Sequence, residues 1–308
     1  MSIVGFEDKV RDFINSGRTQ RALLKDAASW NKICSSLDLI GDTQLAIEAY
    51  PEFEGLADGA SYLVVYGILQ TLLLQQDAAK NIGDSLDIKV NLPKALNDIR
   101  VIRNNAAGHP GHQKENGQSK SCFITRMSIT PFSFQLMTVY SGERKDEFRT
   151  ISIPPLLKVQ EKYLNEILEK VVYEMEKREM EHRNMYKDNK LVDIFPKSSR
   201  YLLGKIAQAA GCKFDHEKGI MNLDTLSESL YKFKSELISR GEWDGNDSVG
   251  YHYDLIEYPI SRLKSYFYGK DDINEKDAYI FSCFISEQFK TLKELAVEID
   301  EAYASELK

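Results

Sequence analysis

The sequence lacks the features of secreted, disulfide-bonded and membrane-spanning proteins. Its four cysteines are Cys34, Cys122, Cys212 and Cys283. They are far apart and form no Cys-x-x-Cys pair, so neither a zinc ribbon nor a disulfide framework is expected. Residues 1–10 contain neither a basic leader nor an apolar run, and the most apolar stretch, 62–74, is shorter than the roughly 20 residues that cross a bilayer. We therefore expect a cytoplasmic protein with no membrane partner.

Positive charge is also scarce. The chain has 40 Lys and Arg against 47 Asp and Glu, a formal net charge of −7. Broad, sequence-independent binding of nucleic acid depends on many Lys and Arg contacts to phosphate, so this balance argues against it. A local cationic cleft stays possible on an acidic surface, although electrostatic steering toward RNA would be poor.

Helical periodicity dominates the sequence. At 308 residues the chain is long enough for about two domains. The pattern predicts a helical domain over 1–190 and a second all-helical domain over 191–308 whose role the sequence does not indicate. The first domain contains three strand-like segments, 122–129, 132–139 and 148–153, which predict an antiparallel β-meander inserted at about 121–153. The predicted helices are 4–14, 21–40, 43–50, 55–82, 92–108, 154–185, 198–210, 223–238, 251–268 and 277–305.

Local signals fix where several of these segments end. Gly41 is expected to stop a helix, Thr43 to cap the next one, and the tract Asn222–Thr225 to cap a helix in the second domain. The polar stretch 111–120 is expected to be a mobile loop. The charged stretch 176–183 is expected to be a solvated arm between the two domains.

The stretch 92–108 is the most informative part of the chain. Pro93 suits the start of a helix, Gly108 suits a left-handed residue past its end, and Pro110 prevents continuation. A helical wheel gathers Leu92, Ala95, Leu96, Ile99, Ile102 and Ala106 on one face, and Arg103 falls on the same face. An arginine cannot lose its charge, so burying it requires an anionic partner, a polar pocket in a second subunit or a ligand cleft.

Two polar residues of the preceding helix are possible neighbours of Arg103. Gln70 and Asp77 lie two turns apart on one face of the apolar helix 55–82, which we expect to pack antiparallel to the Arg103 helix. They either hydrogen-bond at a wet helix edge or line a cleft and orient Arg103.

The segment Arg103-Asn104-x4-His109 resembles the Arg-polar-spacer-His motif of HEPN domains. The resemblance extends to the apolar helix before the motif and to the helical character of about the first 190 residues. It implies a HEPN-like helical bundle, and many HEPN domains are RNA-cleaving toxins or antiviral effectors. Some HEPN toxins also carry a Tyr two residues after the His, the target of an antitoxin, but this position is Gly111 here.

The resemblance implies a metal-independent endoribonuclease that acts at a homodimer interface. Arg103 and His109 would be essential and Asn104 would assist, with no cofactor and with RNA as the substrate. A histidine exchanges protons near neutral pH, and an arginine fork stabilises charge on phosphorus. A two-fold interface would supply both proton-transfer roles from two copies of His109. An antitoxin or regulatory protein is a further possible partner.

Two other interpretations stay open. The chain could be a catalytically inactive HEPN-like scaffold whose Arg103 forms an internal ion pair and whose helices bind partners. Alternatively, His109 and His112 could bind a metal, although two histidines without a nearby cysteine or carboxylate cluster fall short of the usual ligand set. We therefore expect no metal, and we regard His112 only as a possible supporting residue. The aromatic helix 251–268 is expected to serve core packing rather than base stacking.

Overall fold

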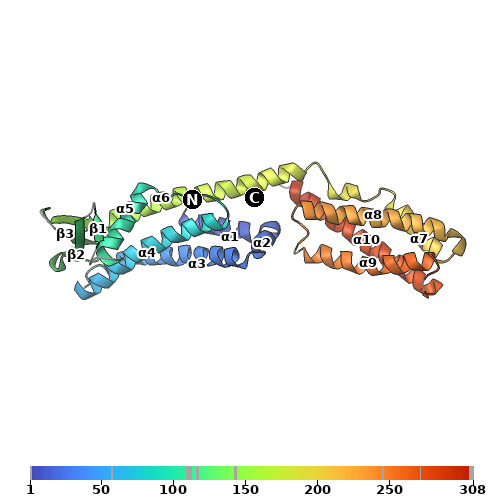
Figure 1. Cartoon of the computed structure of the whole chain (residues 1–308), viewed down its shortest axis with the longest axis horizontal. Coiled ribbons are helices and arrows are strands. Elements are labelled where there is room, and N and C mark those ends of the chain that lie inside the picture. The colour runs from blue at the N-terminus through green and yellow to red at the C-terminus, as the bar shows by residue number, and fades with distance from the viewer. Residues whose placement is uncertain are drawn as a thin grey trace. The chain divides into compact units, whose positions relative to one another are not determined.

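The structure is a computed structural model that describes residues 2–56, 58–108, 113–115, 118–141, 144–244, 246–270 and 272–304. It is mainly helical, with one small antiparallel sheet (Figure 1). The chain divides into two compact units, Met1–Met175 (unit 1) and Glu176–Lys308 (unit 2). This division falls inside the long helix α6 (Ile153–Tyr186) and not after residue 190. Within the described residues, no helix is long and apolar enough to cross a membrane.

The helices of unit 1 enclose one apolar core. They are α1 (Ile3–Ile14), α2 (Gly17–Leu24), α3 (Ala27–Ala49), α4 (Asp58–Ser85), α5 (Lys94–Arg103) and the first part of α6, with a short 3-10 turn, η1 (Tyr50–Phe53), after α3. Val10, Leu37, Leu72, Leu96 and Leu164 come from five of these helices and are completely buried. The bundle predicted from helical periodicity is therefore confirmed in its broad form.

The single helix predicted over 21–40 and its predicted stop at Gly41 were wrong. One helix was expected over 21–40, but the chain breaks at Asp26, whose Oδ1 accepts a hydrogen bond from the Ala28 amide at 3.1 Å. Gly41 lies inside α3, where a Cβ would be 3.4 Å from Glu7 Oε2. This is an ordinary contact distance, and the glycine does not end a helix. Thr43 is not a cap, because its hydroxyl donates to the Leu39 carbonyl within α3 at 2.6 Å.

The inserted sheet has one more strand than the sequence predicted. Its order is β1 (Gln113–Glu115), β2 (Gln118–Ile124), β3 (Ser133–Tyr140) and β4 (Glu147–Ser152), with antiparallel neighbours. The described part of the stretch 111–120 therefore pairs as strands instead of forming a loop. The predicted strand 122–129 ends at Ile124, because a 3-10 turn, η3 (Arg126–Ser128), follows it.

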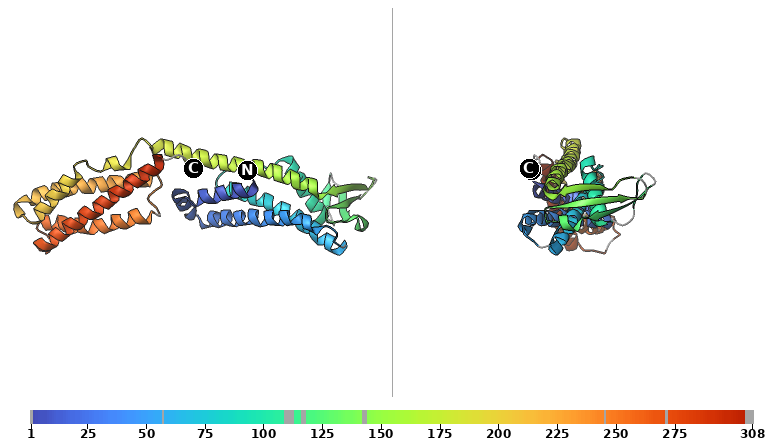
Figure 2. Two further views of the ribbon diagram at one scale, coloured as in Figure 1. Left: turned by 180° about the vertical axis from the view of Figure 1, so that it is seen from behind. Right: turned by 90° about the vertical axis from the view of Figure 1, so that its left-hand side faces the viewer.

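One face of the sheet packs against the helices of unit 1. Figures 1 and 2 show the sheet beside α5 and the first turns of α6. The shared apolar cluster joins Cys122, Phe134 and Ile151 of the sheet to Ile68 of α4 and Ile102 of α5. In addition, the Tyr50 hydroxyl donates to the Pro131 carbonyl at 2.6 Å. The sheet therefore holds the end of α5 in place.

Buried amides connect α4 to α6. Gln76 Nε2 donates to Gln160 Oε1 at 2.8 Å, and Gln160 Nε2 donates to the Leu72 carbonyl at 3.0 Å and to Gln75 Oε1 at 3.1 Å. All three glutamine side chains are at most 1% exposed. Because unpaired buried amides are destabilising, these bonds favour one register between the two helices.

Unit 2 has its own core. Its elements after α6 are η4 (Leu191–Ile194), α7 (Ser199–Ala210), η5 (Lys213–Asp215), α8 (His216–Ser239), α9 (Asp247–Phe267) and α10 (Glu275–Ala304). Phe233, Phe289 and Leu292 are among the side chains buried in it. Asn222 and Thr225 lie in the interior of α8, so the predicted cap there was wrong. The last part of α6 also belongs to unit 2, because His182 Nε2 and the Tyr303 hydroxyl hydrogen-bond at 2.9 Å, which argues against a fully solvated arm.

Candidate functional site

The Arg103 helix has the buried face that the sequence predicted. α5 begins at Lys94, directly after Pro93, and Leu96, Ile99 and Ile102 are buried along it. At its end the backbone continues as a π-turn over Asn104–Gly108. Turns of this type often occur at functional sites, because the extra residue redirects the side chains around it. Arg103 is the last α-helical residue and is half-buried.

Neutral amide oxygens hold the Arg103 guanidinium. Its Nε and Nη2 donate to Gln70 Oε1 of α4 at 3.0 and 2.6 Å, and its Nη1 donates to Asn104 Oδ1 at 3.1 Å. Within the described residues, Arg103 has no carboxylate partner. Its orientation is therefore fixed while its positive charge is not neutralised by a neighbour in the described part of the chain.

The preceding turn of α5 provides a contrast. Arg100 Nη1 forms an ion pair with Asp77 Oδ1 at 2.7 Å. Gln70 therefore contacts Arg103 as one interpretation predicted, whereas Asp77 orients Arg100 instead. These two contacts also confirm that α4 and α5 run antiparallel, because the later residue of α4 meets the earlier residue of α5.

Gly108 lies against the Arg103 guanidinium. A Cβ at this position would lie 2.5 Å from Arg103 Nη1 and 3.2 Å from Asn104 Oδ1. Its φ is outside the left-handed region, so the predicted role as a left-handed helix stop was wrong. A side chain at this position would therefore displace the Arg103 guanidinium from its observed place. No sequence pattern indicates this contact directly.

The structure brings Gln70, Arg103, Asn104 and Gly108 together, and we call these residues the Arg103 site. His109 and His112 lie outside the described residues. The metal-binding alternative concerns the same two histidines and therefore also lies outside the described residues. Among the residues that the structure describes, no group of three or more His, Cys, Asp or Glu side chains is arranged to hold a metal ion.

An exposed strip of α4 leads to the Arg103 site. Leu63 is 75% exposed and Tyr66 is 39% exposed, and a Cβ on Gly67 would meet nothing within 4 Å. Gln70 follows one turn later on the same face. Large exposed apolar side chains beside a polar site are typical of surfaces that another protein covers.

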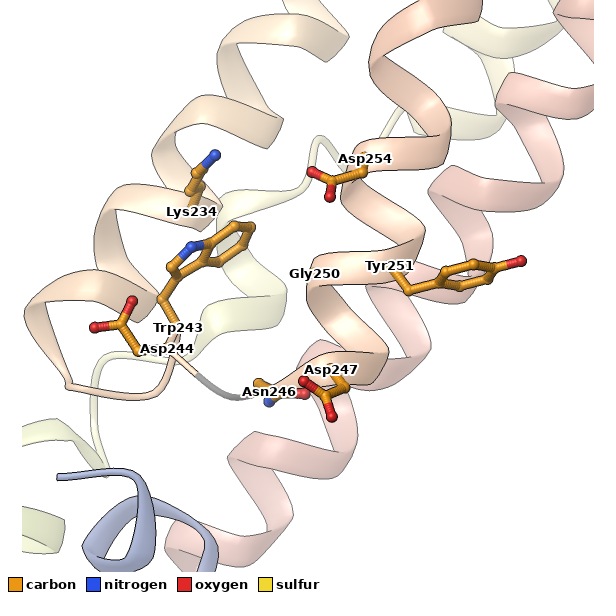
Figure 3. A pocket seen from close by; sticks show the side chains of 8 residues that line it. All are labelled: Lys234, Trp243, Asp244, Asn246, Asp247, Gly250, Tyr251 and Asp254. Carbon is orange, nitrogen blue, oxygen red and sulfur yellow. The ribbon is translucent and has the colours of Figure 1, made fainter. Parts of the chain in front are cut away.

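A polar pocket in unit 2 does not resemble a nucleic-acid site. It is lined by α8, α9 and the loop between them, and Figure 3 shows that Asp244, Asp247 and Asp254 belong to its wall. Lys234 Nζ lies 4.5 Å from the centre of the Trp243 ring, which it partly covers. Three carboxylates against one ammonium would repel phosphate.

Comparisons of this chain with protein-family models, with curated proteins and with solved structures found no match. Its functional interpretation therefore depends on the Arg103 site itself.

Proposed function

We propose that the protein is a metal-independent endoribonuclease of the HEPN type. The observation that carries this proposal is the half-buried Arg103, held by amide oxygens of Gln70 and Asn104 and without a carboxylate partner in the described residues. A fixed guanidinium that keeps its charge is suited to phosphate oxygens, with which arginine forms paired hydrogen bonds. A toxin or an antiviral defence effector would use this activity.

The proposed reaction requires three groups from the protein: a base, an acid and a positive charge. The RNA 2′-hydroxyl attacks the adjacent phosphorus, while one histidine removes its proton and another protonates the departing 5′-oxygen. Arg103 stabilises the charge that develops on the phosphoryl oxygens. The products are a 2′,3′-cyclic phosphate and a 5′-hydroxyl. His109 is the residue that we propose for both proton transfers, one from each subunit.

A homodimer would complete the proposed site. The exposed strip of Leu63, Tyr66 and Gly67 next to Gln70 supports an interface there. In a two-fold interface the same patch of each subunit faces its copy, so two Arg103 sites would lie near each other. A charge at Leu63, as in Leu63→Lys, is expected to convert the dimer to a monomer in analytical ultracentrifugation and to abolish cleavage.

The cleavage assay uses purified protein with total RNA, with and without EDTA. We expect cleavage that survives EDTA and is lost in Arg103→Ala and His109→Ala. Arg100→Ala is the matched control, because it removes an arginine one turn earlier that already has a carboxylate partner. Circular dichroism establishes that each variant is folded. Activity that persists in Arg103→Ala would contradict the proposal.

The second candidate is an inactive HEPN-like scaffold that binds a partner protein through the same exposed strip. The net charge of −7 favours it, because an acidic surface repels RNA. A folded dimer that cleaves no RNA would support this alternative.

A further inference from the structure

A groove in unit 2 lies between α7 and α10 and has a volume of about 660 Å³. This volume is within the usual range for sites that bind small molecules. Small or apolar residues form much of its lining, including Leu203, Gly204 and Ala207 of α7 and Cys283 and Phe289 of α10. All of these residues are described, and all lie within unit 2.

The two helices of the groove run antiparallel. Phe195, which precedes α7, packs on Phe289 of α10 with 5.3 Å between ring centres. At the other end of α7, a Cβ on Gly211 would lie 3.4 Å from Oε1 of Glu275, the first residue of α10. The start of α7 therefore lies beside the middle of α10, and the end of α7 lies beside its start.

Because α7 and α10 run antiparallel, the cationic lining residues lie toward one end of the groove and the small ones toward the other. Arg200, at the start of α7, lies toward the end of the groove that holds Lys290 and Lys293. Gly204, Ala207 and Cys283 lie toward the other end. Glu287 is the acidic residue of the lining, so three cations face one carboxylate in a chain with a net charge of −7. Lys290 has a second carboxylate, Glu294, at 3.7 Å, but both side chains are more than half exposed and such pairs are weak.

We propose that this groove binds a single-chain amphiphile with an anionic head group, such as a long-chain fatty carboxylate. The acyl chain lies along Gly204, Ala207 and Cys283, where small side chains leave room for it. The head group meets Arg200 and Lys293. Charge complementarity favours an anionic head over a cationic or neutral one. This site is separate from the Arg103 site and does not depend on the proposed RNA cleavage.

Cys283 provides a direct probe of the groove. The full-length protein is treated with iodoacetamide in the presence of dodecanoate below its micelle concentration, and alkylation is mapped by mass spectrometry. We expect dodecanoate to slow alkylation of Cys283 but not of Cys212, a half-buried cysteine of the same unit that does not line the groove. Dodecanol and dodecyltrimethylammonium, which lack the anionic head, are expected to protect Cys283 less.

Two variants test the two ends of the groove. Reversing the charge in the double variant Arg200→Glu, Lys293→Glu is expected to weaken dodecanoate binding by about tenfold in calorimetry, because it removes two charge-assisted hydrogen-bond donors. Gly204→Phe is expected to block binding, and it should fold because a Cβ at Gly204 meets nothing within 4 Å. Lys213→Glu is the control, since Lys213 is exposed and outside the groove. Equal protection of Cys283 by all three amphiphiles, or none by dodecanoate, would overturn the proposal.

Discussion

Arg100 and Arg103 differ in the chemical type of their hydrogen-bond partners. They lie one turn apart on α5, yet one is paired with the Asp77 carboxylate and the other with amide oxygens. The sequence predicted that Arg103 lies on the buried face and that Gln70 was a possible neighbour. It could not assign Asp77, because that requires the relative register of α4 and α5, which packing sets.

The amide partner of Arg103 can be tested by changing one atom. Gln70→Glu places a carboxylate at 2.6–3.0 Å from the guanidinium, so the charge of Arg103 is neutralised within the protein. We expect thermal stability to be kept or raised and RNA cleavage to fall by at least about tenfold, since charged hydrogen bonds are about twice as strong as neutral ones. Asn31→Asp makes the same amide-to-carboxylate change on the exposed face of α3, away from the Arg103 site, and should leave cleavage unchanged.

Gly108 gives a second test at this scale. In Gly108→Ala the new Cβ would lie 2.5 Å from Arg103 Nη1, so the guanidinium has to move. We expect cleavage to fall strongly while the melting temperature changes by only a few degrees, because the collision involves a side-chain tip. Gly250→Ala is the control, as its Cβ meets nothing within 4 Å and Gly250 lies in α9, outside the Arg103 site and the exposed strip of α4. Full activity in Gly108→Ala would show that the observed position of Arg103 is not required.

Most of the helices were predictable from the sequence, but several of their ends were not. Helical periodicity located α1, α4, α6, α7, α9 and α10 because their apolar faces are regular. The predicted ends failed where a residue with a stop or capping preference lies inside a longer helix, as at Gly41 in α3 and Asn222 in α8. β1 was missed because its three residues, Gln113–Glu115, have no apolar alternation and form a strand only by pairing with β2.

Tyr50 joins η1 to the turn before β3, and its ionisation gives a pH-dependent prediction. Burial raises the pKa of the Tyr50 hydroxyl, so the folded protein keeps its proton at a pH where the unfolded chain loses it. The contribution of Tyr50 to stability is therefore fully present below about pH 10 and is lost as the pH rises further. Tyr50→Phe also removes the hydrogen bond to Pro131, which costs about 1 kcal/mol at neutral pH. Urea unfolding should show that this difference narrows above pH 10, and a constant difference would contradict the assignment.

The net charge of −7 limits how the proposed RNA substrate can bind. With two arginines per dimer as the phosphate contacts, the logarithm of the binding constant should fall with the logarithm of salt concentration with a slope of about −1.4. Fluorescence anisotropy with a labelled single-stranded RNA measures this slope for the His109→Ala variant, which we expect to bind RNA without cutting it. A slope several times steeper would indicate a broad cationic surface, which the composition argues against.

The amide oxygens around Arg103 have one more consequence. Neither Gln70 nor Asn104 gains or loses a proton in water, and an arginine stays protonated throughout the range in which proteins are folded. The donors and acceptors around this cation are therefore the same in acid and in base. Any acid or alkaline limb in the rate profile of the proposed ribonuclease would report on other titrating groups, and the imidazole of His109 is the first to assign.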